Sequence, residues 1–177
     1  MKTRAAFLGP LLLLWVVTFS VGNASAQGKK GFVFKPGTTK YTQTHIIDVG
    51  DVPNHQLRLF ELHTVYVGDA PEFDGVKVKE RFARAVSDYI DGSGTATGYA
   101  VNILENGDKV FERLAIQAQT AVAADGSKKL GYRSVTTLNG GTGRFTGIRG
   151  TLLGGGGSDL KTGLSGEWAE GEYWFEK

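Results

Sequence analysis

Short segments in which apolar and polar residues alternate recur along most of the chain, and this period of two is typical of β-strands. No segment of useful length has the 3.6-residue period of an amphipathic helix. The pattern predicts about eight strands, at residues 41–47, 55–67, 76–90, 95–104, 109–122 and 164–175, with two more inside 131–157.

Short turns separate these segments, including Asp91-Gly-Ser-Gly94 and Asn106-Gly107. Consecutive strands that are joined by hairpins form an antiparallel meander, and closure of a long meander into a barrel leaves no exposed strand edge. We therefore expect an all-β fold, an antiparallel meander of about eight strands closed into a small β-barrel. A two-sheet β-sandwich is the alternative, because alternation alone is common to both.

Residues 131–157 predict two strands joined by the glycine-rich turn Asn139–Gly143. Glycine adopts positive φ without a steric penalty, so the chain can reverse there. Phe145 and Ile148 follow, and a spacing of three places them on opposite faces of a regular strand. Since Gly147 lies between them, we expect a β-bulge that brings both side chains to the same buried side.

The segment Asn139-Gly-Gly-Thr-Gly-Arg-Phe-Thr-Gly-Ile-Arg-Gly150 resembles the turn-and-strand motif of the allene oxide cyclase-like β-barrels, a group structurally akin to the dirigent proteins. The resemblance implies a small antiparallel barrel and, for an enzyme, a cyclase or isomerase that acts on an apolar substrate. The active-site residues of the cyclases match no positions of this chain, so the resemblance assigns no catalytic residue.

The first 26 residues have the features of a cleaved secretory signal peptide. Lys2 and Arg4 precede a short apolar run, and Ala24-Ser25-Ala26 supplies small residues before the cut. A membrane anchor is the alternative, although the run is short for a span. We expect a secreted or periplasmic protein with a tether at residues 27–40, a single domain at 41–177 and no membrane span after cleavage.

Charge and composition narrow the function classes. Loss of Lys2 and Arg4 reduces the 20 basic residues to 18, equal to the 18 acidic ones, and a neutral chain argues against nucleic-acid binding. There is no cysteine, which excludes disulfides, thiolate chemistry and Cys-type zinc sites. The three histidines have no metal-binding spacing, so we predict neither a metal nor a cofactor.

Residues 76–90 carry the strongest candidate for a site. Lys77, Lys79 and Arg81 share one parity and are expected to face solvent, which turns the other parity inward. Charged groups on an inward face need partners from neighbouring strands, where Glu112 and Asn102 are further candidates. We therefore predict an interior pocket lined by Glu80, Phe82, Arg84, Asp88, Tyr99 and Arg113. The alternative is a structural ion pair on a misassigned face.

The sequence thus predicts an exported barrel that binds a small apolar molecule in its lumen or mouth. A cyclase or isomerase is the alternative, in which a carboxylate would transfer a proton. An interaction module that uses the outer face is a third possibility.

Overall fold

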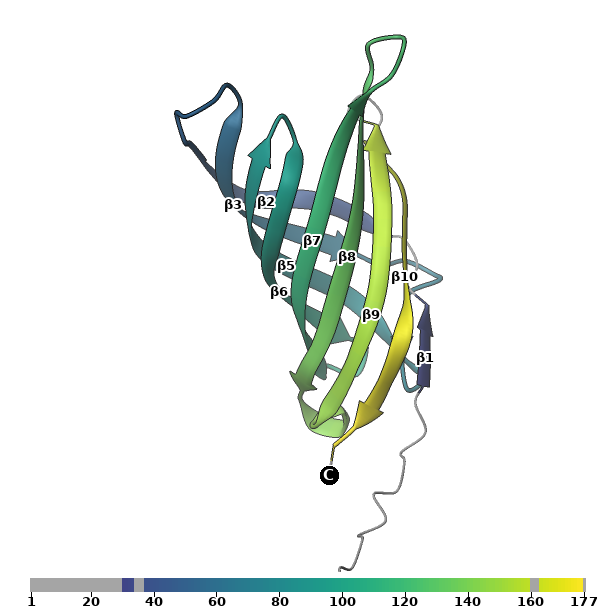
Figure 1. Ribbon diagram of the computed structural model, residues 1–177. Coiled ribbons are helices and arrows are strands. Elements are labelled where there is room, and N and C mark those ends of the chain that lie inside the picture. Colours follow the sequence, from purple (N-terminus) through teal and green to yellow (C-terminus); the bar gives the residue numbers. More distant parts are fainter. Residues whose placement is uncertain (1–29, 34–36, 160–162, 177) are drawn as a thin grey trace, which may run out of the picture.

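The computed structural model describes residues 30–33, 37–159 and 163–176, and these residues form an antiparallel all-β fold (Figure 1). The expected signal peptide and the first residues of the expected tether lie outside the described residues. No helix in the described part of the chain has the length and apolar character needed to cross a membrane.

Ten strands belong to one sheet. Their bounds are β1 Lys30–Val33, β2 Thr38–Asp48, β3 His55–Val65, β4 Glu72–Phe73, β5 Val76–Ile90, β6 Ser93–Leu104, β7 Lys109–Val122, β8 Lys128–Gly141, β9 Ile148–Asp159 and β10 Gly163–Phe175. All eight predicted strands are present. The two additional strands are β4 and β1, and β1 lies in the segment expected as a tether.

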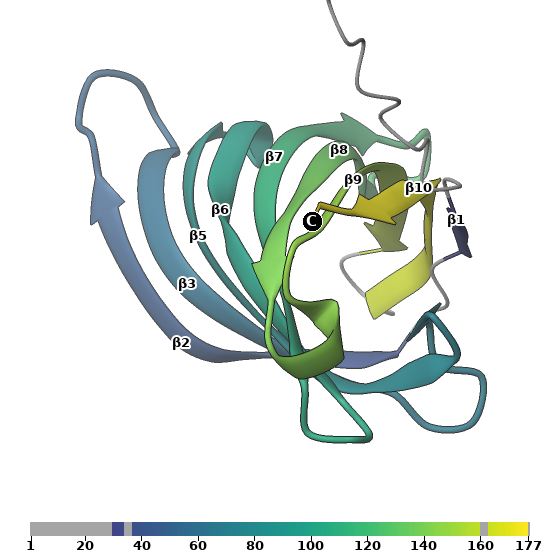
Figure 2. The ribbon, with the colours of Figure 1, turned by 90° about the horizontal axis from the view of Figure 1, so that it is seen from below.

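The strands are arranged as a meander, in the order β1-β10-β9-β8-β7-β6-β5-β3-β2, with β4 paired to β5. The all-β antiparallel prediction is confirmed, and the strands form one continuous sheet instead of two. Figure 2 shows the sheet curving around an interior, with β2 and the β10–β1 pair at its two ends. Among the described residues no hydrogen-bonded ladder joins these two ends.

One end of the curved sheet, here called the base, is filled by the main hydrophobic core. The turns after β6 and β8 and the connection between β3 and β5, residues 66–75, lie at this end (Figure 1). Its buried side chains are Tyr66, Phe73, Val78, Leu104, Val110, Leu138, Phe145, Ile148, Leu152 and Tyr173. Burying a side chain of this size contributes about 1.5–3 kcal/mol. The opposite end, where β5 turns into β6 and β7 into β8, is called the mouth.

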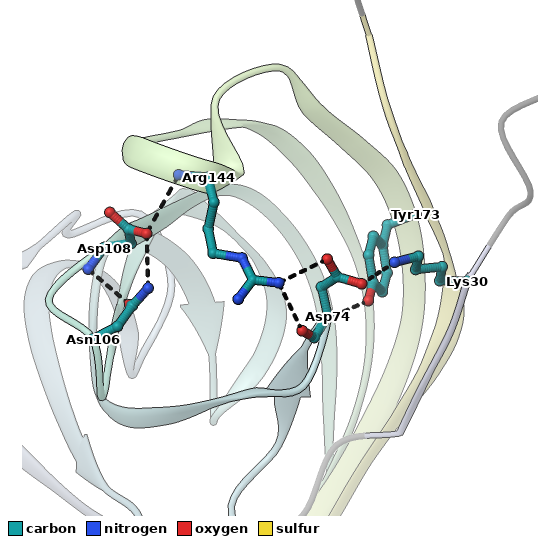
Figure 3. A network of polar contacts seen from close by, with 6 residues as sticks. All are labelled: Lys30, Asp74, Asn106, Asp108, Arg144 and Tyr173. Carbon is teal, nitrogen blue, oxygen red and sulfur yellow. Dashed lines mark hydrogen bonds and ion pairs between the residues drawn. The ribbon is translucent and has the colours of Figure 1, made fainter.

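A polar network centred on Asp74 connects residues 66–75 to neighbouring elements at the base (Figure 3). The Asp74 carboxylate pairs with Lys30 of β1, and Arg144 donates to it over 3.0 Å. The Asp74 amide donates to the Tyr173 hydroxyl of β10 over 2.8 Å. Exposed ion pairs are individually weak, but this network joins the connection to three separate elements.

The turn between β8 and β9 contains a one-turn 3₁₀ helix, η1 Gly143–Phe145. Phe145 and Ile148 are both 0% exposed and share the base core, so their predicted common burial is confirmed. The expected β-bulge is not the cause. The 3₁₀ turn and a positive φ of 77° at Gly147 bring the two side chains to the same side, at the point where β9 begins.

We predict that Gly143→Val lowers the free energy of unfolding by about 1–3 kcal/mol. Gly143 has φ 54°, and a Cβ there would lie 2.0 Å from Oδ1 of Asp108. The matched control is Gly131→Val, whose nearest neighbouring atom would be 4.0 Å away. Urea unfolding of both variants measures the difference; equal midpoints would show that Gly143 tolerates a side chain.

Candidate functional site

The predicted pocket residues do not line the interior. A register shift in the β5–β6 ladder moves the pairing from Val78–Leu104 to Glu80–Ile103, so β5 carries one extra residue there. Such a bulge reverses the parity of every residue that follows it. Before the bulge Val78 faces inward, whereas after it Arg81 and the odd-numbered residues do.

The site prediction is therefore wrong for its six residues, which lie on the outer face: Glu80, Phe82, Arg84, Asp88, Tyr99 and Arg113. They form surface contacts with their neighbours. Arg84 pairs with Glu61 at 2.6 Å while 56% of its side chain stays exposed, and Arg113 lies over the ring of Tyr99, 6.0 Å from the ring centroid. The alternative, structural ion pairs on a misassigned face, describes these residues.

Two histidines complete the outer contacts. His63 stacks on Phe82 with ring centroids 4.3 Å apart, and its Nε2 lies 2.9 Å from a carboxylate oxygen of Glu80. His55 lies between Asp88 and Asp51. These contacts position side chains on the outer face of the sheet.

The interior holds a cavity of about 710 Å³ above the base core. Apolar and small side chains make up most of its wall, and β3, β5, β7, β8, β9 and β10 all contribute. Among the lining residues are Phe60, Leu62, Ala83, Ala85, Leu114, Ile116, Ala118, Leu130, Leu152 and Ala169. The cavity adjoins the unpaired edge between β2 and β10, because Thr39 and Tyr41 of β2 also line it.

Strong curvature explains why glycine and alanine recur on the inner face of the sheet. Inward side chains converge in a curved sheet, so neighbouring strands leave little room for a Cβ. A Cβ at Gly98 would lie 2.1 Å from the Arg84 carbonyl oxygen, and one at Gly154 would lie 2.8 Å from Oγ of Ser134. Glycine at these two positions avoids both contacts.

A buried polar cluster lies on the inner wall. Arg81 donates from Nε and Nη2 to Oε2 of Glu112, over 3.1 and 2.8 Å, and the Asn102 amide donates to Oε1 over 2.7 Å. Glu112 is 5% exposed and Asn102 3%. The sequence named both as possible partners of Glu80, Arg84 and Asp88, but the bulge places Arg81 beside Glu112 instead.

A second polar pair faces the cavity from β8 and β10. The Tyr132 hydroxyl donates to Oε1 of Glu167 over 2.9 Å, and both residues are paired in register with Gly156 of β9. Since Gly156 has no side chain, the phenol reaches across the strand. Burial and the negative charge of Glu167 raise the pKa of the Tyr132 phenol, so it remains protonated and donates.

The upper wall near the mouth is aromatic and basic. The rings of Tyr41 and Phe60 pack edge to face with centroids 5.6 Å apart, and Tyr89 and Arg58 also line the cavity. Sequence reasoning missed Arg58 and Arg81. One signal was available: Arg81 shares its parity with Ala83, Ala85 and Ser87, and such short residues are suited to a crowded concave face.

In the described part of the chain no three histidine or acidic side chains are grouped so that they could hold a metal ion. Comparisons with protein-family models, with curated proteins and with solved structures found no match.

We predict that His55 makes stability depend on pH. Its Nδ1 lies 2.6 Å from Asp51 and its Nε2 2.7 Å from Asp88, so both nitrogens donate when the ring is protonated. Hydrogen bonds to Asp88 and Asp51 raise the pKa of His55 above 6.5. The stabilisation is complete below the unfolded pKa and is lost as pH rises through the folded one.

The free energy of unfolding, measured from pH 6 upward, should therefore fall more steeply for the wild type than for His55→Gln. Asp88→Asn, which removes one of the two acceptors, should reduce the slope in part. Identical slopes for the wild type and His55→Gln would contradict the prediction.

We also predict that Glu112→Gln is strongly destabilising, by about 3–5 kcal/mol, because it leaves the Arg81 guanidinium buried without a counter-charge. The control is Glu61→Gln, which removes the carboxylate that Arg84 pairs with on the outer face and should cost much less. Chemical denaturation compares the two; a similar loss in both variants would show that burial does not set the strength of these pairs.

Proposed function

We propose that the curved sheet functions as a barrel whose interior binds a small apolar molecule. The observation that carries this proposal is the cavity of about 710 Å³, a size within the roughly 300–1,000 Å³ range of small-molecule sites. Its wall is mainly apolar, and the base core closes it at one end. Binding would remove apolar surface from water on both ligand and protein.

The covalent path of the chain supports a barrel. Only four residues separate Val33 at the end of β1 from Thr38 at the start of β2, so these two residues are at most about 18 Å apart. The two ends of the sheet are thereby held near each other at the base. An opening that remains between β2 and β10 would give a ligand its path to the interior.

Export fits this proposal. The segment at residues 1–26 predicts secretion or a periplasmic location, where a carrier would meet apolar molecules that dissolve poorly in water. A fold without cysteine depends on its packed core instead of disulfides in such a compartment.

A bulky residue inside the cavity should block binding. Ala169 of β10 lines the cavity, whereas Ala115 of β7 is exposed on the outer face. We predict that Ala169→Phe lowers the affinity for the neutral probe N-phenyl-1-naphthylamine at least about tenfold, which corresponds to about 1.4 kcal/mol. Ala115→Phe, the same change on the opposite face, should bind like the wild type. Fluorescence titration measures both; equal loss in both variants, or no binding to the wild type, would refute the proposal.

An isomerase of the cyclase type is the second candidate, favoured by the Tyr132–Glu167 pair on the cavity wall. A carboxylate beside a phenol is suited to proton transfer to or from a bound molecule. Apolar molecules extracted from purified wild type and from Glu167→Gln can be compared by mass spectrometry. One molecule common to both supports the carrier. A substrate retained only by the variant, with its isomer of equal mass in the wild type, supports the isomerase.

A further inference from the structure

Arg58 is a charged residue on the cavity wall, and it has no counter-ion among the residues that the structure describes. It belongs to the inner face of β3, one layer above Phe60 toward the mouth, and it lines the cavity. Its Nε is buried without a hydrogen-bond partner, and no described carboxylate forms an ion pair with it. Arginine cannot lose its charge at physiological pH, so the guanidinium stays cationic in this wall.

The carboxylates that line the same cavity already have other partners. Glu112 accepts from Arg81 and Asn102, Glu167 from Tyr132, and Asp91 from Asn54 at 2.8 Å. None of these carboxylates is an ion-pair partner of Arg58. Among the described residues, the three carboxylates of the wall thus pair with residues other than Arg58.

Ser87 provides a second, independent observation at the same place. It lies directly opposite Arg58 in the β3–β5 register and is 1% exposed, and its Oγ also has no hydrogen-bond partner. Buried polar atoms are hydrogen-bonded in the great majority of cases, and an unpaired one calls for an explanation. Two such atoms thus lie on facing positions of neighbouring strands, and Arg58 is the one of the two residues that lines the cavity.

We propose that the molecule bound in the cavity carries one anionic group, which pairs with the Arg58 guanidinium near the mouth while its apolar body extends toward the base. The inference rests on the proposed ligand-binding function and specifies its ligand class. A guanidinium presents a planar fork of donors that fits a carboxylate or sulfonate, and such charge-assisted bonds are the strong ones. Lys40 and Lys128, which also line the cavity, add positive potential for an incoming anion.

The surroundings of Arg58 favour a flat aromatic body next to the anionic group. Tyr41, Phe60 and Tyr89 form the wall around it, and aromatic rings pack well edge to face or offset against another ring. Burial raises the pKa of the Tyr89 phenol, so this hydroxyl remains a neutral donor. An aryl carboxylate or aryl sulfonate has the chemistry that this wall recognises.

The test uses two probes that share one ring system. N-phenyl-1-naphthylamine is neutral, and 8-anilino-1-naphthalenesulfonate is the same molecule with an added sulfonate. The wild type should bind the anionic probe about tenfold more tightly than the neutral one at low salt. Arg58→Gln should abolish this preference and leave the affinity for the neutral probe unchanged, which also verifies that the cavity is intact.

The control is Arg113→Gln, which removes an equal charge from the outer face and should keep the preference of the wild type. Equal binding of both probes by the wild type, or a preference that survives Arg58→Gln, would overturn the inference while ligand binding itself stands. Should neither probe bind the wild type, the proposed function fails, and this inference with it. The wild-type comparison requires no variant, so equal binding of the two probes would overturn the inference even if Arg58→Gln does not fold.

Discussion

The packing of large side chains at the base is the interaction on which the rest of this structure depends. Hydrogen bonds among the described strands leave the sheet open between β2 and the β10–β1 pair, so its curvature has to be held by other contacts. Phe73 comes from the connection between β3 and β5, Phe145 from the turn after β8, and Tyr173 from β10. The Phe73 ring packs edge to face against both of the others, with centroids 6.4 Å from Phe145 and 5.7 Å from Tyr173. This core joins segments that are far apart in the chain.

The base core also determines where the interior can be empty. Large residues fill the base, while glycine and alanine recur among the inner positions of the strands above it. At Gly98 and Gly154 the curvature leaves no room for a Cβ. Aromatic and charged side chains occupy other parts of the wall, and the cavity lies between them.

Charged residues behave differently on the two faces. On the outer face, pairs such as Arg84 with Glu61 are partly exposed and contribute little to stability. On the inner face, Arg81 and Glu112 are satisfied by each other and by Asn102, because an unpaired charge there would be costly. Arg58 departs from this rule among the described residues, because its buried Nε has no hydrogen-bond partner, and this departure is the basis of the proposed anionic ligand.

The sequence by itself determined the strands, their order as a meander and the common burial of Phe145 and Ile148, since a period of two and glycine-rich turns are local properties. The bounds of β5 and β7 were predicted to the residue. Only the tertiary structure decided which face of β5 points inward, because one extra residue at the Val78–Glu80 bulge reverses the parity of all that follow. A bulge depends on pairing with β6, so alternation along β5 does not locate it. The short side chains that share the parity of Arg81 were the one local signal of the reversed face. The candidate site therefore lies on the inner face of β5, which carries Arg81, and not on the outer face, which carries Arg84. Arg58 was recognised only in the structure, because its Nε has no hydrogen-bond partner there.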